Sequence, residues 1–203
     1  MLRSILYFAV VLAFTGVVFG QSITGSAHDF SDSTWNSSGE ICVICHAPHV
    51  QDYTNPPEPL WNHQVTTATF TLYSSSTLNA TVSQPDGYSK LCLSCHDGTV
   101  AIDNFGGNTA GTEHVSGDAL IGTDLSNDHP VSFTYDATLA TADGGLFDPA
   151  NTNSGLGGTI DEDMLFGGKL QCASCHNPHD DTVAKFLVKS NATSALCLTC
   201  HNK

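Results

Sequence analysis

Four copies of the pattern C-x-x-C-H constrain this sequence, and together they use all eight of its cysteines. The copies occupy residues 42–46, 92–96, 172–176 and 197–201. A C-x-x-C pair followed directly by histidine is typical of covalent c-type haem attachment, in which two thiols bind one porphyrin and the histidine binds its iron. Histidine makes up about one residue in twenty here, so four such histidines by chance have odds of about one in 10^5.

The sequence therefore predicts four covalently attached haem c groups. The predicted attachment residues are Cys42, Cys45, Cys92, Cys95, Cys172, Cys175, Cys197 and Cys200. The predicted proximal iron ligands are His46, His96, His176 and His201. A zinc ribbon or a dithiol redox site also uses C-x-x-C pairs, but neither requires histidine as the next residue.

The N-terminus has the pattern of a secretory signal peptide over residues 1–20. Arg3 precedes an apolar run, and small residues follow shortly before Gln21. The apolar run is short for a membrane span and no second such run exists, so we expect an exported protein without a retained transmembrane segment.

The chain is strongly acidic, with six basic residues against twenty acidic ones and a formal net charge of −14. Haem propionates would add to that charge. Nucleic acid and anionic membranes are therefore excluded as expected partners, whereas other cytochromes and metal-oxide acceptors fit. Simple solubility is an equally good explanation of the charge.

Four porphyrins on so short a chain change the expected architecture, because each is a large apolar disc that must be shielded from water. We expect a mostly irregular multihaem cytochrome c fold with the haem stack as its core. Short helices are expected at the C-x-x-C-H motifs, together with a few short strands. Residues 65–73 and 131–135 are the predicted strands, and residues 180–189 and 194–201 are predicted short helices, the second with Ser194 as its N-cap.

The order of the motifs repeats along the chain. Each half has a lone upstream histidine, a C-x-x-C-H-x-P-H motif and a closing L-C-x-x-C-H motif. This repeat predicts two dihaem modules, at 21–97 and 129–203, joined by Gly- and Asp-rich linker loops at 98–128.

Each of the four predicted irons has a second axial position, which needs a distal ligand. Met164 is the only methionine after the signal peptide, whereas six histidines lie outside the motifs, so histidine on both sides of each iron is favoured. The repeat matches His28 with His129 and His49 with His179, and these four are the predicted distal ligands. We expect each module to supply its own two.

His49 lies three residues after His46 with Pro48 between them, so we expect it to point away from its own haem and toward a neighbouring one. His63 and His114 are the second-choice distal ligands. Carboxylates next to the predicted ligands are candidates to accept the second ring N–H, and these are Asp29, Asp128 and Asp180.

The chain resembles the multihaem c-type cytochromes with doubled C-x-x-C-H motifs, specifically the small tetrahaem members that polymerise as extracellular cytochrome nanowires. The resemblance covers essentially the whole mature chain and is carried by the two C-x-x-C-H-x-P-H motifs and by residues 28–31, 60–63 and 128–131. It implies a secreted protein at the cell surface whose identical subunits meet head to tail, with electrons passing between closely stacked haems. His28, on an N-terminal arm, is then a candidate ligand for a neighbouring subunit's iron, and little chain follows His201 to cover the last haem.

A haem with histidine on both sides of its iron has no open position for a substrate, so we expect an electron carrier without catalytic residues. A soluble periplasmic tetrahaem shuttle is the alternative, and it differs only in assembly and location. A multihaem reductase, the second alternative, needs one iron with an open position.

Overall fold

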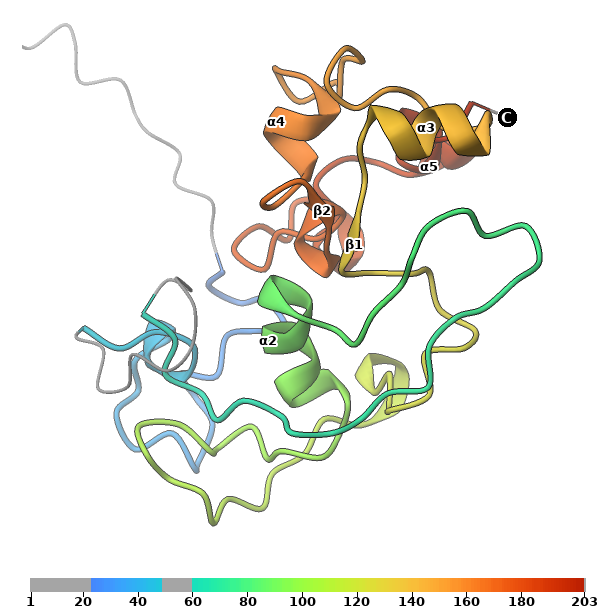
Figure 1. Ribbon diagram of the computed structural model, residues 1–203. Helices are drawn as coiled ribbons and strands as arrows, with labels where there is room; N and C mark the ends of the chain where they lie inside the picture. The colour runs from blue at the N-terminus through green and yellow to red at the C-terminus, as the bar shows by residue number, and fades with distance from the viewer. Residues whose placement is uncertain (1–22, 49–59, 203) are drawn as a thin grey trace, which may run out of the picture.

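The computed structural model describes residues 23–48 and 60–202, which form two halves on either side of helix α2 (Gly87–His96) (Figure 1). Most of this chain is irregular, with a few short helices and one two-stranded sheet, as the sequence predicted. The predicted signal peptide at 1–20 lies outside the described residues.

Helical turns occur at all four C-x-x-C-H motifs. Within residues 23–48 and 60–202, the α-helices besides α2 are α3 (Ala137–Asp143), α4 (Ile160–Met164) and α5 (Cys197–Cys200). The 3₁₀ turns are η1 (Cys42–Ile44), η2 (Gly117–Ala119), η3 (Cys172–Ser174), η4 (Ala184–Phe186) and η5 (Ala192–Ser194). The motif cysteines lie on η1, α2, η3 and α5 or directly after them, which confirms the prediction of short helices at these places.

The sheet joins β1 (Phe133–Thr134) to β2 (Lys169–Leu170) in antiparallel register, with Phe133 opposite Leu170. The predicted strand at 131–135 therefore exists in shortened form. The predicted strand at 65–73 was wrong, because Thr71 alone forms an isolated bridge, to Asp124, and no neighbouring strand extends the pairing.

The C-terminal half has an apolar core of its own. Its buried members are Phe133, Tyr135, Leu139, Ala140, Ile160, Met164, Leu165, Leu170, Leu196 and Cys200. The two helices beside it are capped by side chains, since Asp136 accepts from the Leu139 N–H at 2.8 Å and Thr159 forms a capping box with Glu162. Gly144 ends α3 in the left-handed region, at φ 68°.

The N-terminal half is held together mainly by polar contacts around a small apolar cluster of Phe70, Leu93 and Leu125. Leu125 belongs to residues 98–128, the predicted linker, and packs against this cluster. The Ile102 N–H donates to the Glu113 carbonyl at 2.6 Å, and Asn104 donates to the Gln64 side chain at 2.8 Å. In the structure the predicted linker is thus part of the first half.

Two smaller predictions near the C-terminus were wrong. Residues 180–189 contain only the turn η4, in which Lys185 has φ 62°, because its left-handed backbone interrupts any helix. Ser194 is not the N-cap of the last helix, since α5 starts one residue after Leu196 and Ser194 itself has φ 65°. Across residues 23–48 and 60–202 no helix is long and apolar enough to cross a membrane.

We predict that Ile160→Ala lowers the free energy of unfolding by about 2–5 kcal/mol, because Ile160 is fully buried in the C-terminal core and the truncation leaves a cavity. Denaturant unfolding of the purified protein followed by circular dichroism measures the change. Leu156→Ala, in a side chain that is 39% exposed, is the control and should cost no more than about 0.5 kcal/mol. Equal losses in the two variants would contradict the assigned core.

Candidate haem-binding site

One helical turn positions the two cysteines and the histidine of each motif. In the first motif the His46 N–H donates to the Cys42 carbonyl at 2.8 Å, and the third and fourth motifs repeat this bond at 3.0 Å, from His176 and from His201. Residues at positions i, i+3 and i+4 lie on one face of a helical turn. The turn therefore presents both thiols and the imidazole of a motif on the same side.

Three of the four motif histidines face a second histidine, and in each case that second histidine is a predicted distal ligand. The ring centroids of His96 and His28 are 6.1 Å apart, and those of His46 and His179 are 6.0 Å apart. The third pair joins His201 to His129 at 6.3 Å. These pairs bring together segments that are far apart in the sequence.

The spacing of these pairs fits a haem iron between the two rings. A nitrogen ligand lies about 2.0 Å from a first-row metal and the imidazole centroid roughly 1 Å farther out, so two imidazoles on opposite sides of one iron have centroids about 6 Å apart. Ordinary ring contacts spread over about 4.5–7 Å. The centroid distances of the three pairs differ by no more than 0.3 Å, and each pair joins one motif histidine to one predicted distal ligand.

Backbone carbonyls orient these imidazoles. The Nδ1 of His96 lies 2.7 Å from the Ala119 carbonyl, and that of His129 lies 2.9 Å from the Pro130 carbonyl. A carbonyl can only accept, so each Nδ1 must carry the proton, and Nε2 keeps its lone pair for a metal. His176 makes the same bond to Lys185 at 2.8 Å.

Two of the three predicted carboxylate partners, Asp29 and Asp180, accept hydrogen bonds from other groups. The Asp29 carboxylate accepts from Gly25, at 2.7 Å, and from Ser31, whereas Asp180 accepts from Thr182 at 3.0 Å. Short polar side chains readily bond the backbone two residues away, and this local preference turns them from the neighbouring imidazoles.

His28 is held in the second half of its own chain. Its ring stacks on Phe186 at 4.6 Å and 14°, and it donates to the backbone carbonyl of Pro178. Burial, followed by His96, lowers the pKa of His28. The N-terminal arm thus reaches across to residues 178–186 while its imidazole faces the second motif.

The pairing of His46 with His179 crosses the boundary between the two predicted modules. His179 follows the third motif, yet its ring faces the first. His179 holds the place in the second half that corresponds to His49, whereas the prediction made for His49 falls on a residue outside the described ones. The expectation that each module keeps its own distal ligands does not hold for this pair.

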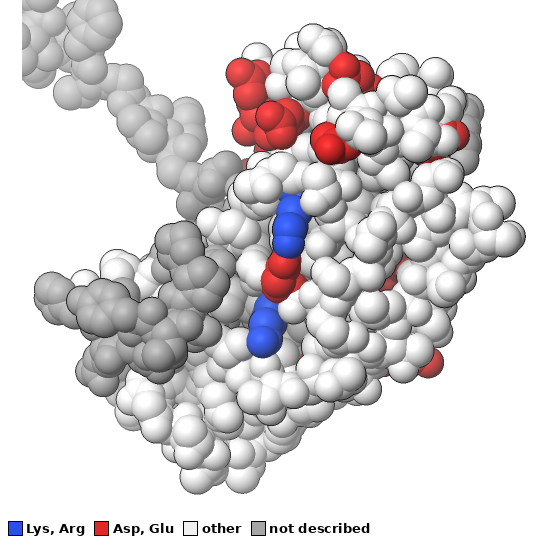
Figure 2. All heavy atoms as spheres, in the orientation of Figure 1, with Lys and Arg blue, Asp and Glu red and all other residues white. Residues whose placement is uncertain are grey.

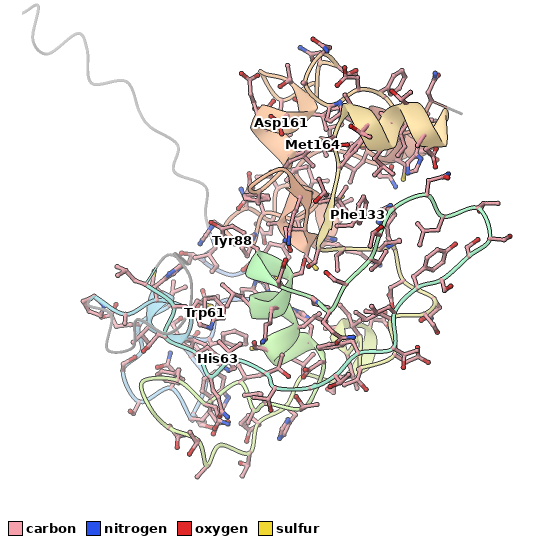
Figure 3. All side chains as sticks on the ribbon, in the orientation of Figure 1. Trp61, His63, Tyr88, Phe133, Asp161 and Met164 are labelled. Carbon is pink, nitrogen blue, oxygen red and sulfur yellow. The ribbon has the colours of Figure 1, made fainter. Side chains whose placement is uncertain are left out.

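The remaining histidines have different surroundings. His63 is 4% exposed, and its two ring nitrogens lie 2.8 Å from the Gln64 carbonyl and 3.0 Å from the Ala101 carbonyl (Figure 3). Burial lowers the pKa of His63, which favours the neutral ring, and a neutral imidazole has one N–H, so one of these two contacts to a carbonyl is a hydrogen bond. His114 is exposed. His49 lies outside the described residues.

The cysteines of successive motifs approach one another. Burial raises the pKa of Cys95 to about 12, with Cys45 adding to the rise, and burial raises the pKa of Cys175 to about 11, with Cys200 adding. Between these pairs the thiols of Cys92 and Cys172 interact with each other, and this interaction lowers the pKa of Cys172. Each motif therefore has a cysteine near a cysteine of the next motif.

The comparison with protein families finds a match in the last part of the chain. The family described as "Doubled CXXCH motif" matches residues 165–203, which contain the third and fourth motifs. No curated protein matches the chain. The match supports a multihaem c-type cytochrome, and the motifs indicate covalently bound haem c.

We predict that Met164→Leu leaves the haem absorption spectrum unchanged. Met164 is 2% exposed within the C-terminal core, where its thioether packs among apolar side chains (Figure 3). Visible spectra of the oxidised and reduced variant provide the measurement. A spectral shift on this volume-conserving change would show that methionine binds an iron.

Proposed function

We propose that this chain carries electrons through four c-type haems, each with histidine on both sides of its iron. The histidine pairs at 6.0–6.3 Å are the observation that carries this proposal. They assign His46 with His179, His96 with His28 and His201 with His129. We assign His49 to His176, the remaining motif histidine, because the repeat predicts His49 as the fourth distal ligand.

When bound, haem supplies a reversible one-electron couple at its iron. The chain's own residues decide how that couple is used. Histidines paired in this way would hold the iron from both sides and would leave no open position for a substrate, which favours an electron carrier over a reductase. Histidine in place of methionine as the second ligand also favours low reduction potentials.

The order of the attachment sites supports a continuous electron path. The thiols of Cys92 and Cys172 interact with each other, Cys45 lies near Cys95 of the second motif, and Cys200 lies near Cys175 of the third. Porphyrins joined to these sulfurs would be neighbours in the same sequence. We propose that electrons pass along the motifs in chain order.

The charge of the surface bears on the redox partners. Figure 2 shows acidic side chains gathered over α4, which contains Asp161, Glu162 and Asp163. Partners with a basic docking face, such as other cytochromes, or positively charged metal-oxide surfaces, fit this charge.

Assembly into an extracellular filament of identical subunits is part of our proposal and rests on the resemblance described above. The ring of His28 faces His96 of its own chain. A filament built from this conformation would therefore join subunits through contacts other than exchange of His28. The soluble periplasmic shuttle is the alternative with the same haem arrangement.

We predict that His28→Ala, His129→Ala and His179→Ala each convert about one quarter of the haem from low spin to high spin, because each removes one distal ligand. Electron paramagnetic resonance of the oxidised protein, with haem content measured in parallel, tests this. His114→Ala is the matched control and should keep all haems low spin. A fully low-spin His28→Ala protein would contradict the assignment.

We predict that the purified haem-loaded protein forms unbranched filaments as its concentration is raised. Negative-stain electron micrographs at several concentrations supply the measurement. Globular monomers at every concentration would favour the periplasmic shuttle. Turnover of nitrite or hydroxylamine by the unmodified protein would instead support the reductase.

A further inference from the structure

A buried polar network joins the two halves of the molecule beside the second and third attachment motifs. Its central side chains are almost inaccessible to water, with Ser89 0%, Ser132 1% and Gln171 3% exposed. They come from α2, from the residue before β1 and from the residue between β2 and η3.

Gln171 is the centre of this network. Its Oε1 accepts from the Ser89 N–H at 3.0 Å, from the Ser89 hydroxyl and from the Ser132 hydroxyl at 3.2 Å. Its Nε2 donates to the Asp86 carboxylate at 3.0 Å, and Asp86 also forms an ion pair with Lys169. Every polar atom of the Gln171 amide thus bonds to a residue outside its own segment.

Ser89 connects this network directly to the third motif. Its hydroxyl accepts from the Cys172 N–H at 3.0 Å. Ser89 also lies three residues before Cys92 on α2, so the two side chains share a face of the helix. The bond from Ser89 to Cys172 therefore lies one helical turn from the paired thiols of Cys92 and Cys172.

The chemistry of the joint favours one fixed register. An apolar contact tolerates small sliding movements, whereas a satisfied buried network loses several hydrogen bonds if one half shifts against the other. Gln171 also fixes the third motif itself, because its N–H donates to the Ser174 hydroxyl at 2.9 Å. The apolar clusters of the two halves do not include these residues.

We propose that Ser89 and Gln171 are positioning residues that set the spacing and relative orientation of the second and third haems, and thereby the electronic contact between the two halves. The inference rests on the proposed function, since it requires haem at both motifs. Ser89 and Gln171 would then control the transfer of electrons from the second haem to the third, which is the step between the two halves.

Circular dichroism in the Soret region tests the inference, because neighbouring haems produce an exciton couplet whose shape and amplitude depend on their relative placement. We expect Ser89→Ala and Gln171→Ala to lose couplet amplitude at unchanged haem content and spin state. Ser154→Ala is the matched control, since Ser154 is also 0% exposed but bonds within the C-terminal half, to Asp163 and Gly158. It should keep the wild-type couplet.

A second pair of variants tests the same contact if the alanine variants fail to fold. Gln171→Glu puts a carboxylate against Asp86 and should alter the couplet, whereas Asp86→Asn combined with Gln171→Glu reverses donor and acceptor and should restore it. Wild-type couplets in both Ser89→Ala and Gln171→Ala, a double variant no better than Gln171→Glu alone, or a wild-type protein without a couplet would overturn the inference. A wild-type protein without haem would instead overturn the proposed function.

Discussion

Under the proposed ligation, two imidazoles that share one iron must stand about 6 Å apart with their nitrogens directed at each other, and this requirement would govern how the chain is arranged. It brings His28 from the N-terminal arm to the second motif and His179 from the second half to the first. Regular secondary structure is not needed to bring these histidine rings together. Short turns place each proximal histidine, and carbonyl oxygens fix the orientation of several imidazole rings.

The same requirement would also hold the two halves of the molecule together. The pair of His46 with His179 crosses between them, and so does the buried network around Gln171. Both contacts are directional, and both lie close to attachment cysteines. A chain of haems conducts only while its members keep their spacing, so a rigid joint is more useful here than a large apolar interface, which tolerates sliding.

The sequence predicted the parts of the site that depend on local spacing. C-x-x-C-H places its two cysteines and its histidine by a single turn, and the repeat pointed to His28, His129 and His179, whose rings lie beside motif histidines in the structure. The sequence could not predict which histidines pair, because His46 and His179 are brought together by long-range packing that no local pattern encodes. The extended segment at 65–73 also failed as a strand, since pairing depends on a neighbour. Gln171 carries no motif, and only the three-dimensional contacts reveal its role.

An experimental structure of the haem-loaded protein tests the central claim most directly, because it shows which two histidines bind each iron. We expect His46 with His179, His96 with His28, and His201 with His129, all within one chain. An iron held by a different pair, or by a histidine from a neighbouring subunit in any of these three places, would contradict it.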